Sequence, residues 1–137
     1  MSLQLERIKN AFEFIEGEFS HTGELHSTDS LIAKLDILCN SLPFVNSQMA
    51  YAKQELNIAK VKAYNKLQMS SAAQSKYYAP SLAKDYIAAQ CHNEQFAFDM
   101  CERCSRTIVH IIDALRTSIS ALKQESIVSQ YSQNVIS

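Results

Sequence analysis

The chain has 137 residues, a net charge of −1, 47% hydrophobic residues and 20% charged residues. This composition is typical of an ordinary soluble domain with enough apolar residues to bury a core, and not of a disordered or membrane-spanning chain. Two glycines and two prolines are too few for many tight turns or sheet corners, so long helices are favoured. We predict a single all-α domain over residues 1–137.

The N-terminal ten residues contain Glu6, Arg7 and Lys9, which interrupt any apolar run, so we expect no signal peptide. No stretch approaches the roughly 18 apolar residues of a transmembrane helix. We therefore expect no membrane partner and a cytoplasmic location. In that compartment the four cysteines are expected to be reduced thiols.

Residues 1–42 are predicted to form short helices and a loop. A first helix is expected over residues 3–16, followed by a stop at Gly17, because apolar residues fall at helical spacing: Leu5, Ile8, Phe12 and Ile15. A second short helix is expected, with a cap at Ser27, Thr28 or Asp29 and with Leu31, Leu35 and Leu38 on one face. Pro43 is expected to end that helix or to open the next one.

Residues 44–78 are predicted to form a long helix, because apolar or small residues recur at steps of three and four. They are Val45, Met49, Ala52, Leu56, Ala59, Ala63, Leu67 and Ser70. Pro80 cannot continue this helix cleanly, and it favours an extended conformation for Ala79.

Residues 82–125 contain no glycine or proline and are predicted to form a second long, unbroken helix. Its apolar seam alternates steps of three and four, and Ile112 and Ile119 widen it: Cys101, Cys104, Ile108, Ile111, Leu115, Ser118 and Leu122. The serine-rich tail, residues 126–137, either frays or extends the helix.

The expected fold is therefore a long antiparallel helical hairpin, coiled-coil-like, with one or two short N-terminal helices packed on it. Two long helices alone bury little apolar surface, so the short helices or another subunit must cover the seam. We expect a homo-oligomer.

Cys101 and Cys104 form a Cys-x-x-Cys that admits three interpretations. A zinc site needs four ligands, so Cys39 or a loop histidine, His21 or His26, would have to complete it. A redox pair usually follows a strand and opens a helix, whereas this pair lies inside a predicted helix. Both cysteines also belong to the apolar seam, which favours buried core residues and no metal site.

No catalytic residue is predicted. The chain has no G-x-S-x-G, no glycine-rich phosphate loop and no H-E-x-x-H, and its carboxylates are scattered among bases. Cys91 and His92 are adjacent, and neighbours on a helix point in directions about 100° apart, so they do not form a dyad. We expect no enzyme, no cofactor and no small-molecule substrate.

Positive charge concentrates in the first long helix. Residues 43–79 hold five lysines and one acid, whereas residues 1–42 have a net charge of −4. Four of these lysines, together with nearby tyrosines, are candidates for binding single-stranded DNA or an acidic protein: Lys53, Lys60, Lys62 and Lys66. A solvated face, or pairing with the acidic N-terminal segment, is the favoured interpretation. Secondary candidates on the second long helix are Arg103, Arg106 and Arg116, of which Arg116 can pair with Asp113.

Two segments carry a family resemblance. The stretch "DALRTSISALKQE", after the Ala-, Lys- and Tyr-rich stretch "YAKQELNIAKVKAYNKL", resembles short all-helical proteins of bacteriophages and prophages. Those proteins are often encoded near single-strand annealing or other recombination genes. The resemblance covers roughly residues 45–125, and it implies a non-enzymatic accessory protein in the host cytoplasm with no catalytic residues to transfer.

The functional expectation is a helical interaction protein that assists DNA recombination or replication by binding nucleic acid or a recombination protein. Two alternatives stay open. One is an inhibitor or adaptor that binds a host protein through a helix face. The other is a zinc-stabilised helical module.

Overall fold

The computed structural model describes residues 6–11, 13, 28–74 and 78–136, and all secondary structure in this part of the chain is helical. Three helices follow one another: α2 (Thr28–Gln74), α3 (Pro80–Gln90) and α4 (His92–Ile136). A short helical segment precedes them at residues 6–11. The prediction of an all-helical chain is therefore confirmed. The remaining residues of the predicted first helix and the loop after it lie outside the described residues.

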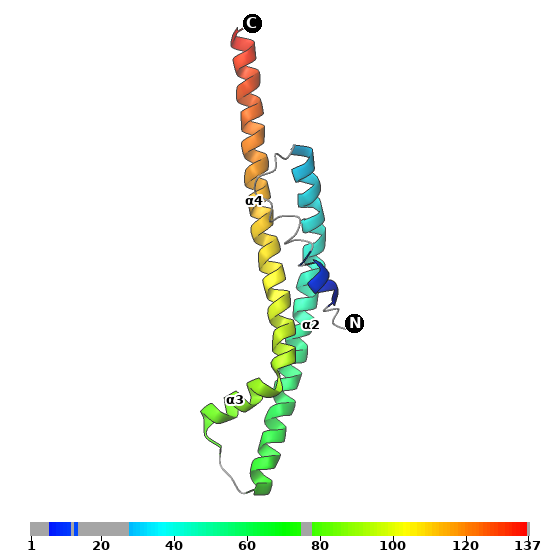
Figure 1. The fold of residues 1–137 in the computed structure, drawn as a ribbon, viewed down its shortest axis with the longest axis vertical. Coiled ribbons are helices and arrows are strands. Elements are labelled where there is room, and N and C mark those ends of the chain that lie inside the picture. The colour runs from blue at the N-terminus through cyan, green and yellow to red at the C-terminus, as the bar shows by residue number, and fades with distance from the viewer. Residues whose placement is uncertain (1–5, 12, 14–27, 75–77, 137) are drawn as a thin grey trace.

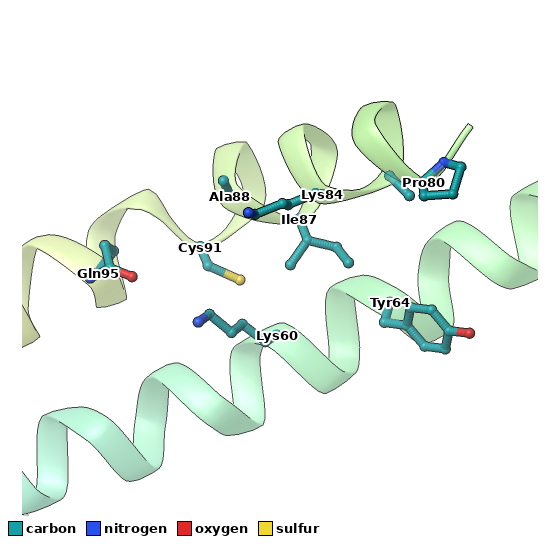
Figure 2. Close-up of a pocket in the computed structure, with 9 residues that line it drawn as sticks. Lys60, Tyr64, Pro80, Lys84, Ile87, Ala88, Cys91 and Gln95 are labelled. Atoms are coloured by element: carbon teal, nitrogen blue, oxygen red, sulfur yellow. The ribbon is translucent and has the colours of Figure 1, made fainter. Parts of the chain in front are cut away.

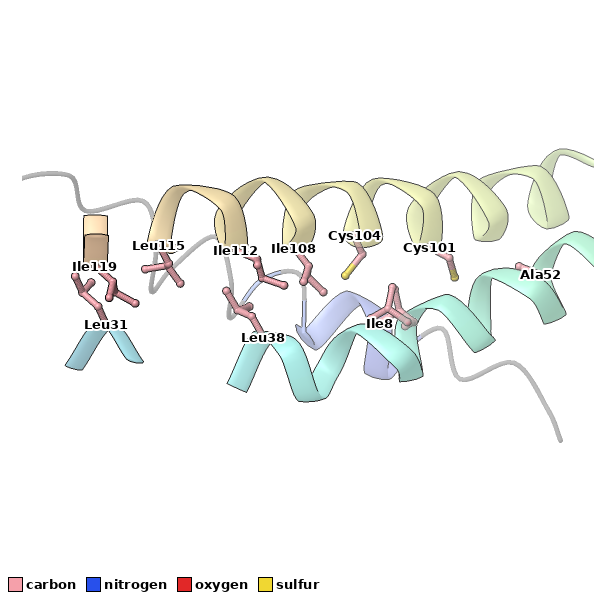
Figure 3. Packing of buried hydrophobic residues seen from close by; sticks show 11 residues of the cluster. Ile8, Leu31, Leu38, Ala52, Cys101, Cys104, Ile108, Ile112, Leu115 and Ile119 are labelled. Carbon is pink, nitrogen blue, oxygen red and sulfur yellow. The ribbon is translucent and has the colours of Figure 1, made fainter. Parts of the chain in front are cut away.

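The long helices α2 and α4 lie side by side and run in opposite directions, whereas α3 branches away from them near the start of α4 (Figure 1). Their contact holds the larger core cluster, in which Leu31 lies near Ile119 at one end and Ala52 near Cys101 at the other (Figure 3). A smaller cluster, with Leu56, Ala63 and Cys91, continues it towards α3.

The α2 seam is one uninterrupted pattern of alternating four- and three-residue steps. Its members are Leu31, Leu35, Leu38, Leu42, Val45, Met49, Ala52, Leu56, Ala59 and Ala63, all buried or partly buried. Leu42 links the leucines of the predicted short helix to the seam of the predicted long helix. Two separate helices were expected here, so that prediction was wrong.

Pro43 lies inside α2 and does not end it. Proline removes the hydrogen bond to the carbonyl four residues earlier, which is that of Cys39. Both residues are exposed, so this carbonyl stays on the solvent side of the helix. Burial of Leu38 and Val45, each 1% exposed, stabilises the helix on both sides of the proline and offsets a cost of about 3 kcal/mol.

The α4 seam differs in register from the expected one. Ile112 and Ile119 are buried, whereas Ile111 is only partly buried and Ser118 is exposed. The buried positions are Cys101, Cys104, Ile108, Ile112, Leu115 and Ile119. Two consecutive four-residue steps, from Cys104 to Ile112, follow the 3.6-residue period of a straight helix better than a strict heptad does.

Cys91 breaks the helix that was expected to be continuous over residues 82–125, so this prediction was also wrong. Its backbone angles, φ −108° and ψ 18°, leave the helical region. Its N–H donates to the carbonyls of Ile87 (3.1 Å) and Ala88 (3.3 Å), and the His92 ring Nδ1 donates to the carbonyl of Ala89 at 2.9 Å. These bonds satisfy the end of α3 without glycine or proline.

Pro80 opens α3 as its first residue, and Ala79 before it is extended, with φ −59° and ψ 145°. This confirms the interruption predicted around Pro80. Farther along the chain, α4 continues to Ile136, so the serine-rich tail extends the helix. No helix among the described residues has an apolar stretch long enough to cross a bilayer.

The short N-terminal segment packs against both long helices. Ile8 is fully buried in the main cluster. The residues on either side of Ile8 form cation–π contacts with the two long helices. The Arg7 guanidinium lies 4.4 Å from the ring centroid of Phe44 in α2, and the Lys9 amino group lies 5.7 Å from that of Phe96 in α4. One short helical segment therefore covers part of the seam.

The proline can be tested by substitution. Pro43→Ala should raise the free energy of unfolding by about 1–3 kcal/mol, because alanine restores a hydrogen bond in the middle of a helix. The measurement is urea denaturation followed by circular dichroism. The exposed control Gln54→Ala should change stability by less than about 0.5 kcal/mol. A less stable Pro43→Ala variant would mean that the packing depends on the proline.

Candidate binding surfaces

The cysteines of the Cys-x-x-Cys lie in the core. Cys101 and Cys104 are both fully buried, between α4 and α2, in contact with the cluster that contains Ile8 and Ile108 (Figure 3). Cys91 is buried in the smaller cluster, and Cys39 is exposed. Their small side chains pack with Ile8 in this cluster, which is a structural role for both cysteines.

Burial keeps these thiols protonated. It raises the pKa of Cys101 above the ordinary value, and burial together with the charge of Cys101 raises the pKa of Cys104 to about 11. A metal ligand or a redox nucleophile has to be a thiolate, so this environment works against both chemistries. Among the residues described, no group of three or more His, Cys, Asp or Glu side chains could hold a metal ion. His21 and His26 lie outside those residues.

The four candidate lysines of α2 do not form one stripe. All of them are exposed: Lys53, Lys60, Lys62 and Lys66. At 100° per residue, Lys53 and Lys60 share one side of the helix, and the other two lie about 120° or more away from them. No ion pair joins any of them to an acid in the described part of the chain, so their charge is available to a ligand.

The three candidate arginines of α4 are exposed and separated from one another. Arg106 is paired with Glu102 one turn earlier. The expected ion pair of Arg116 with Asp113 is not formed between these two described residues. The Thr117 hydroxyl donates a hydrogen bond to the Asp113 backbone carbonyl. Arg103 is exposed without an ion pair to a described residue. These arginines do not join the lysines in a single basic surface.

The end of α4 forms a surface that was not singled out from the sequence. Past Leu122 the helix projects beyond the first turns of α2 (Figure 1), and every residue from 123 to 135 is exposed. We call residues 123–135 the α4 extension. Its large apolar side chains are 63% to 71% exposed: Ile127, Val128, Tyr131 and Val135.

The apolar side of α4 changes at the start of this extension. The direction that faces α2 at Leu122 continues with Ser126, Ser129 and Gln133, within about 40° round the helix. Val128 and Tyr131 lie between about 120° and 180° away from it. The side of α4 that faces α2 is therefore polar beyond the first turns of α2, and the opposite side is apolar there. This switch could have been found by following the seam past Leu122.

A second surface lies between α2 and α3. Lys60 and Tyr64 of α2 and Ala83 and Ile87 of α3 line a hollow of about 600 Å³. Cys91 lies at its end (Figure 2). We call it the α2–α3 hollow. The sequence offered no sign of it, because it depends on the direction in which α3 leaves the helix break at Cys91.

The raised thiol pKa predicts a loss of stability at high pH. An unfolded thiol loses its proton near pH 9, whereas Cys104 keeps it to about 11, so the free energy of unfolding should fall as the pH rises from 9 to 11. Each thiol contributes at most about 1.4 kcal/mol per pH unit. Urea denaturation at several pH values should show a shallower decline in Cys101→Ala/Cys104→Ala than in the wild type. The exposed control Cys39→Ala should follow the wild type, and identical slopes in all three proteins would refute the protonated-core assignment.

No family model, curated protein or solved structure matches the chain. Its function is therefore to be inferred from the α4 extension, the lysines of α2 and the α2–α3 hollow.

Proposed function

We propose that this protein is a non-enzymatic helical interaction protein, and that the α4 extension is its main binding surface. One observation carries the proposal: the apolar side of α4 changes to the opposite face at the point where α2 ends. A helix that only needed to pack on α2 would gain nothing from apolar side chains there. Four large side chains on about two exposed turns of helix call for a second partner.

The partner we propose is a second copy of the chain. Residues 126–137 contain no charged residue, so two extensions can meet without like-charge repulsion and without leaving a charge buried. The step from Val128 to Tyr131 to Val135 is three and then four residues, the spacing of a coiled-coil seam. A twofold pairing would place the same stripe of each copy against the other.

This interface is small. A stable dimer buries roughly 800 Å² on each partner, and four side chains on one helix contribute less than that. Association through the extension should therefore depend on protein concentration. A host protein that offers a matching apolar helix would compete for the same surface, and this is the adaptor version of the function.

The self-association can be tested with two substitutions on neighbouring residues. Val128→Glu places a charge in the proposed interface and should shift the protein to monomer, as measured by size-exclusion chromatography with light scattering over a range of concentrations. Ser129→Glu adds the same charge on the α2-facing side and should associate like the wild type. A wild type that stays monomeric at high concentration, or equal effects of both variants, would exclude the dimer.

Nucleic-acid binding is the second candidate function, and it is supported by Lys53, Lys60, Lys62 and Lys66, which form no ion pair with a described residue. Exposed ammonium groups with no ion pair can neutralise phosphates. This version corresponds to the accessory role in DNA recombination or replication that the resemblance to phage proteins implies. Because the lysines divide between two sides of α2, one strand can contact only one pair at a time.

The nucleic-acid version predicts that a single-stranded oligonucleotide binds at low salt and is released steeply as salt is added. Lys62→Gln/Lys66→Gln should lower the affinity and reduce the slope of log K against log salt by roughly two. Arg116→Gln/Lys123→Gln, which removes two positive charges from α4, is the charge-matched control and should have little effect. A gel assay with no shift at micromolar protein and low salt would rule this version out.

A further inference from the structure

The α2–α3 hollow exists because α3 is not packed closely on α2. None of the 11 residues of α3 is fully buried, although α3 lies across α2. Its inward positions are Pro80, Ala83 and Ile87, at steps of three and four residues. Only Ile87 reaches the small cluster on α2, and Ala83 is too short to fill the space. The result is a hollow of about 600 Å³ between the apolar side of α3 and α2.

The two ends of the hollow are lined by different side chains. At one end the ring of Tyr64 and the ring of Pro80 line the hollow (Figure 2). At the other end Cys91, which is 2% exposed, closes it beside Gln95. The volume of the hollow, about 600 Å³, lies within the roughly 300–1,000 Å³ that is usual for small-molecule sites. The space between its two ends suits a ligand with a long apolar body.

Two positive charges flank the Cys91 end. Lys60 of α2 and Lys84 of α3 extend their amino groups on either side of Cys91 (Figure 2). Neither lysine forms an ion pair with an acid in the part of the chain that the structure describes. None of the described residues that line the hollow is an aspartate or a glutamate. The uncompensated charge therefore favours an anion at this end and an apolar group at the other.

We propose that the α2–α3 hollow binds a single-chain fatty acid. Its carboxylate accepts hydrogen bonds from the amino groups of Lys60 and Lys84. Its aliphatic chain covers Ile87 and Ala83 and extends towards Tyr64. Burial of that chain removes from water the apolar face of α3 that α2 leaves uncovered, so the ligand also holds α3 in place. This binding is independent of the α4 extension, which lies at the far end of α4.

The test is isothermal titration calorimetry of the full chain with dodecanoate, below its micellar concentration. One equivalent should bind, and dodecanol, which has the same chain but no charge, should bind at least roughly tenfold more weakly. Lys60→Gln/Lys84→Gln should weaken dodecanoate binding by roughly tenfold or more. Lys62→Gln, an exposed lysine of α2 outside the hollow, should bind like the wild type.

A second variant tests the apolar wall. Ala83→Phe fills the hollow and should abolish binding, provided that circular dichroism shows an unchanged helical content; Val128→Glu should leave binding intact. No heat of binding up to millimolar dodecanoate would overturn the proposal. So would equal binding by the wild type and Lys60→Gln/Lys84→Gln, or binding to anionic lipid vesicles but not to free dodecanoate.

Discussion

The apolar seam between α2 and α4 is the contact on which every other feature of this protein depends. It joins two helices of 47 and 45 residues, and most of the stability of such helices in a protein comes from packing an apolar face against a partner. Cys101 and Cys104 are fully buried in it, and Leu38 and Val45 are buried on either side of the proline. Because burial continues on both sides of Pro43, the helix tolerates a residue that would usually end it.

The candidate binding surfaces lie where this seam stops. At one end α4 projects beyond the first turns of α2 (Figure 1). The apolar residues of this α4 extension lie on the side of the helix opposite to the seam, and they are exposed. At the other end the helix breaks at Cys91, and α3 crosses α2 (Figure 2). The short side chains of α3 leave the hollow between the two helices unfilled. Both surfaces lie outside the main core, so the proposed binding at either surface would leave the α2–α4 contact in place.

The candidate site was only partly predictable. Exposure of Lys53 and Lys60 followed from the helical pattern, because both lie outside the apolar seam. That they have no acidic partner among the described residues depends on which helix lies next to them. The favoured core role of Cys101 and Cys104 followed from seam spacing, and the structure places both in the core. The hollow could not be predicted, since its two walls lie about twenty residues apart in the chain. The direction in which α3 crosses α2 depends on the helix break at Cys91.

The sequence by itself determined that the chain is helical, that Pro80 separates two helical regions, and which positions are apolar. Those properties are local, because they depend on the period of the side chains and on the backbone limits of proline. Tertiary structure alone decided that Pro43 stays inside a helix and that Cys91 ends one. It also decided that Ile119 rather than Ser118 faces α2. Each of these outcomes follows from burial against a segment distant in the chain, which outweighs local preference at the positions it covers.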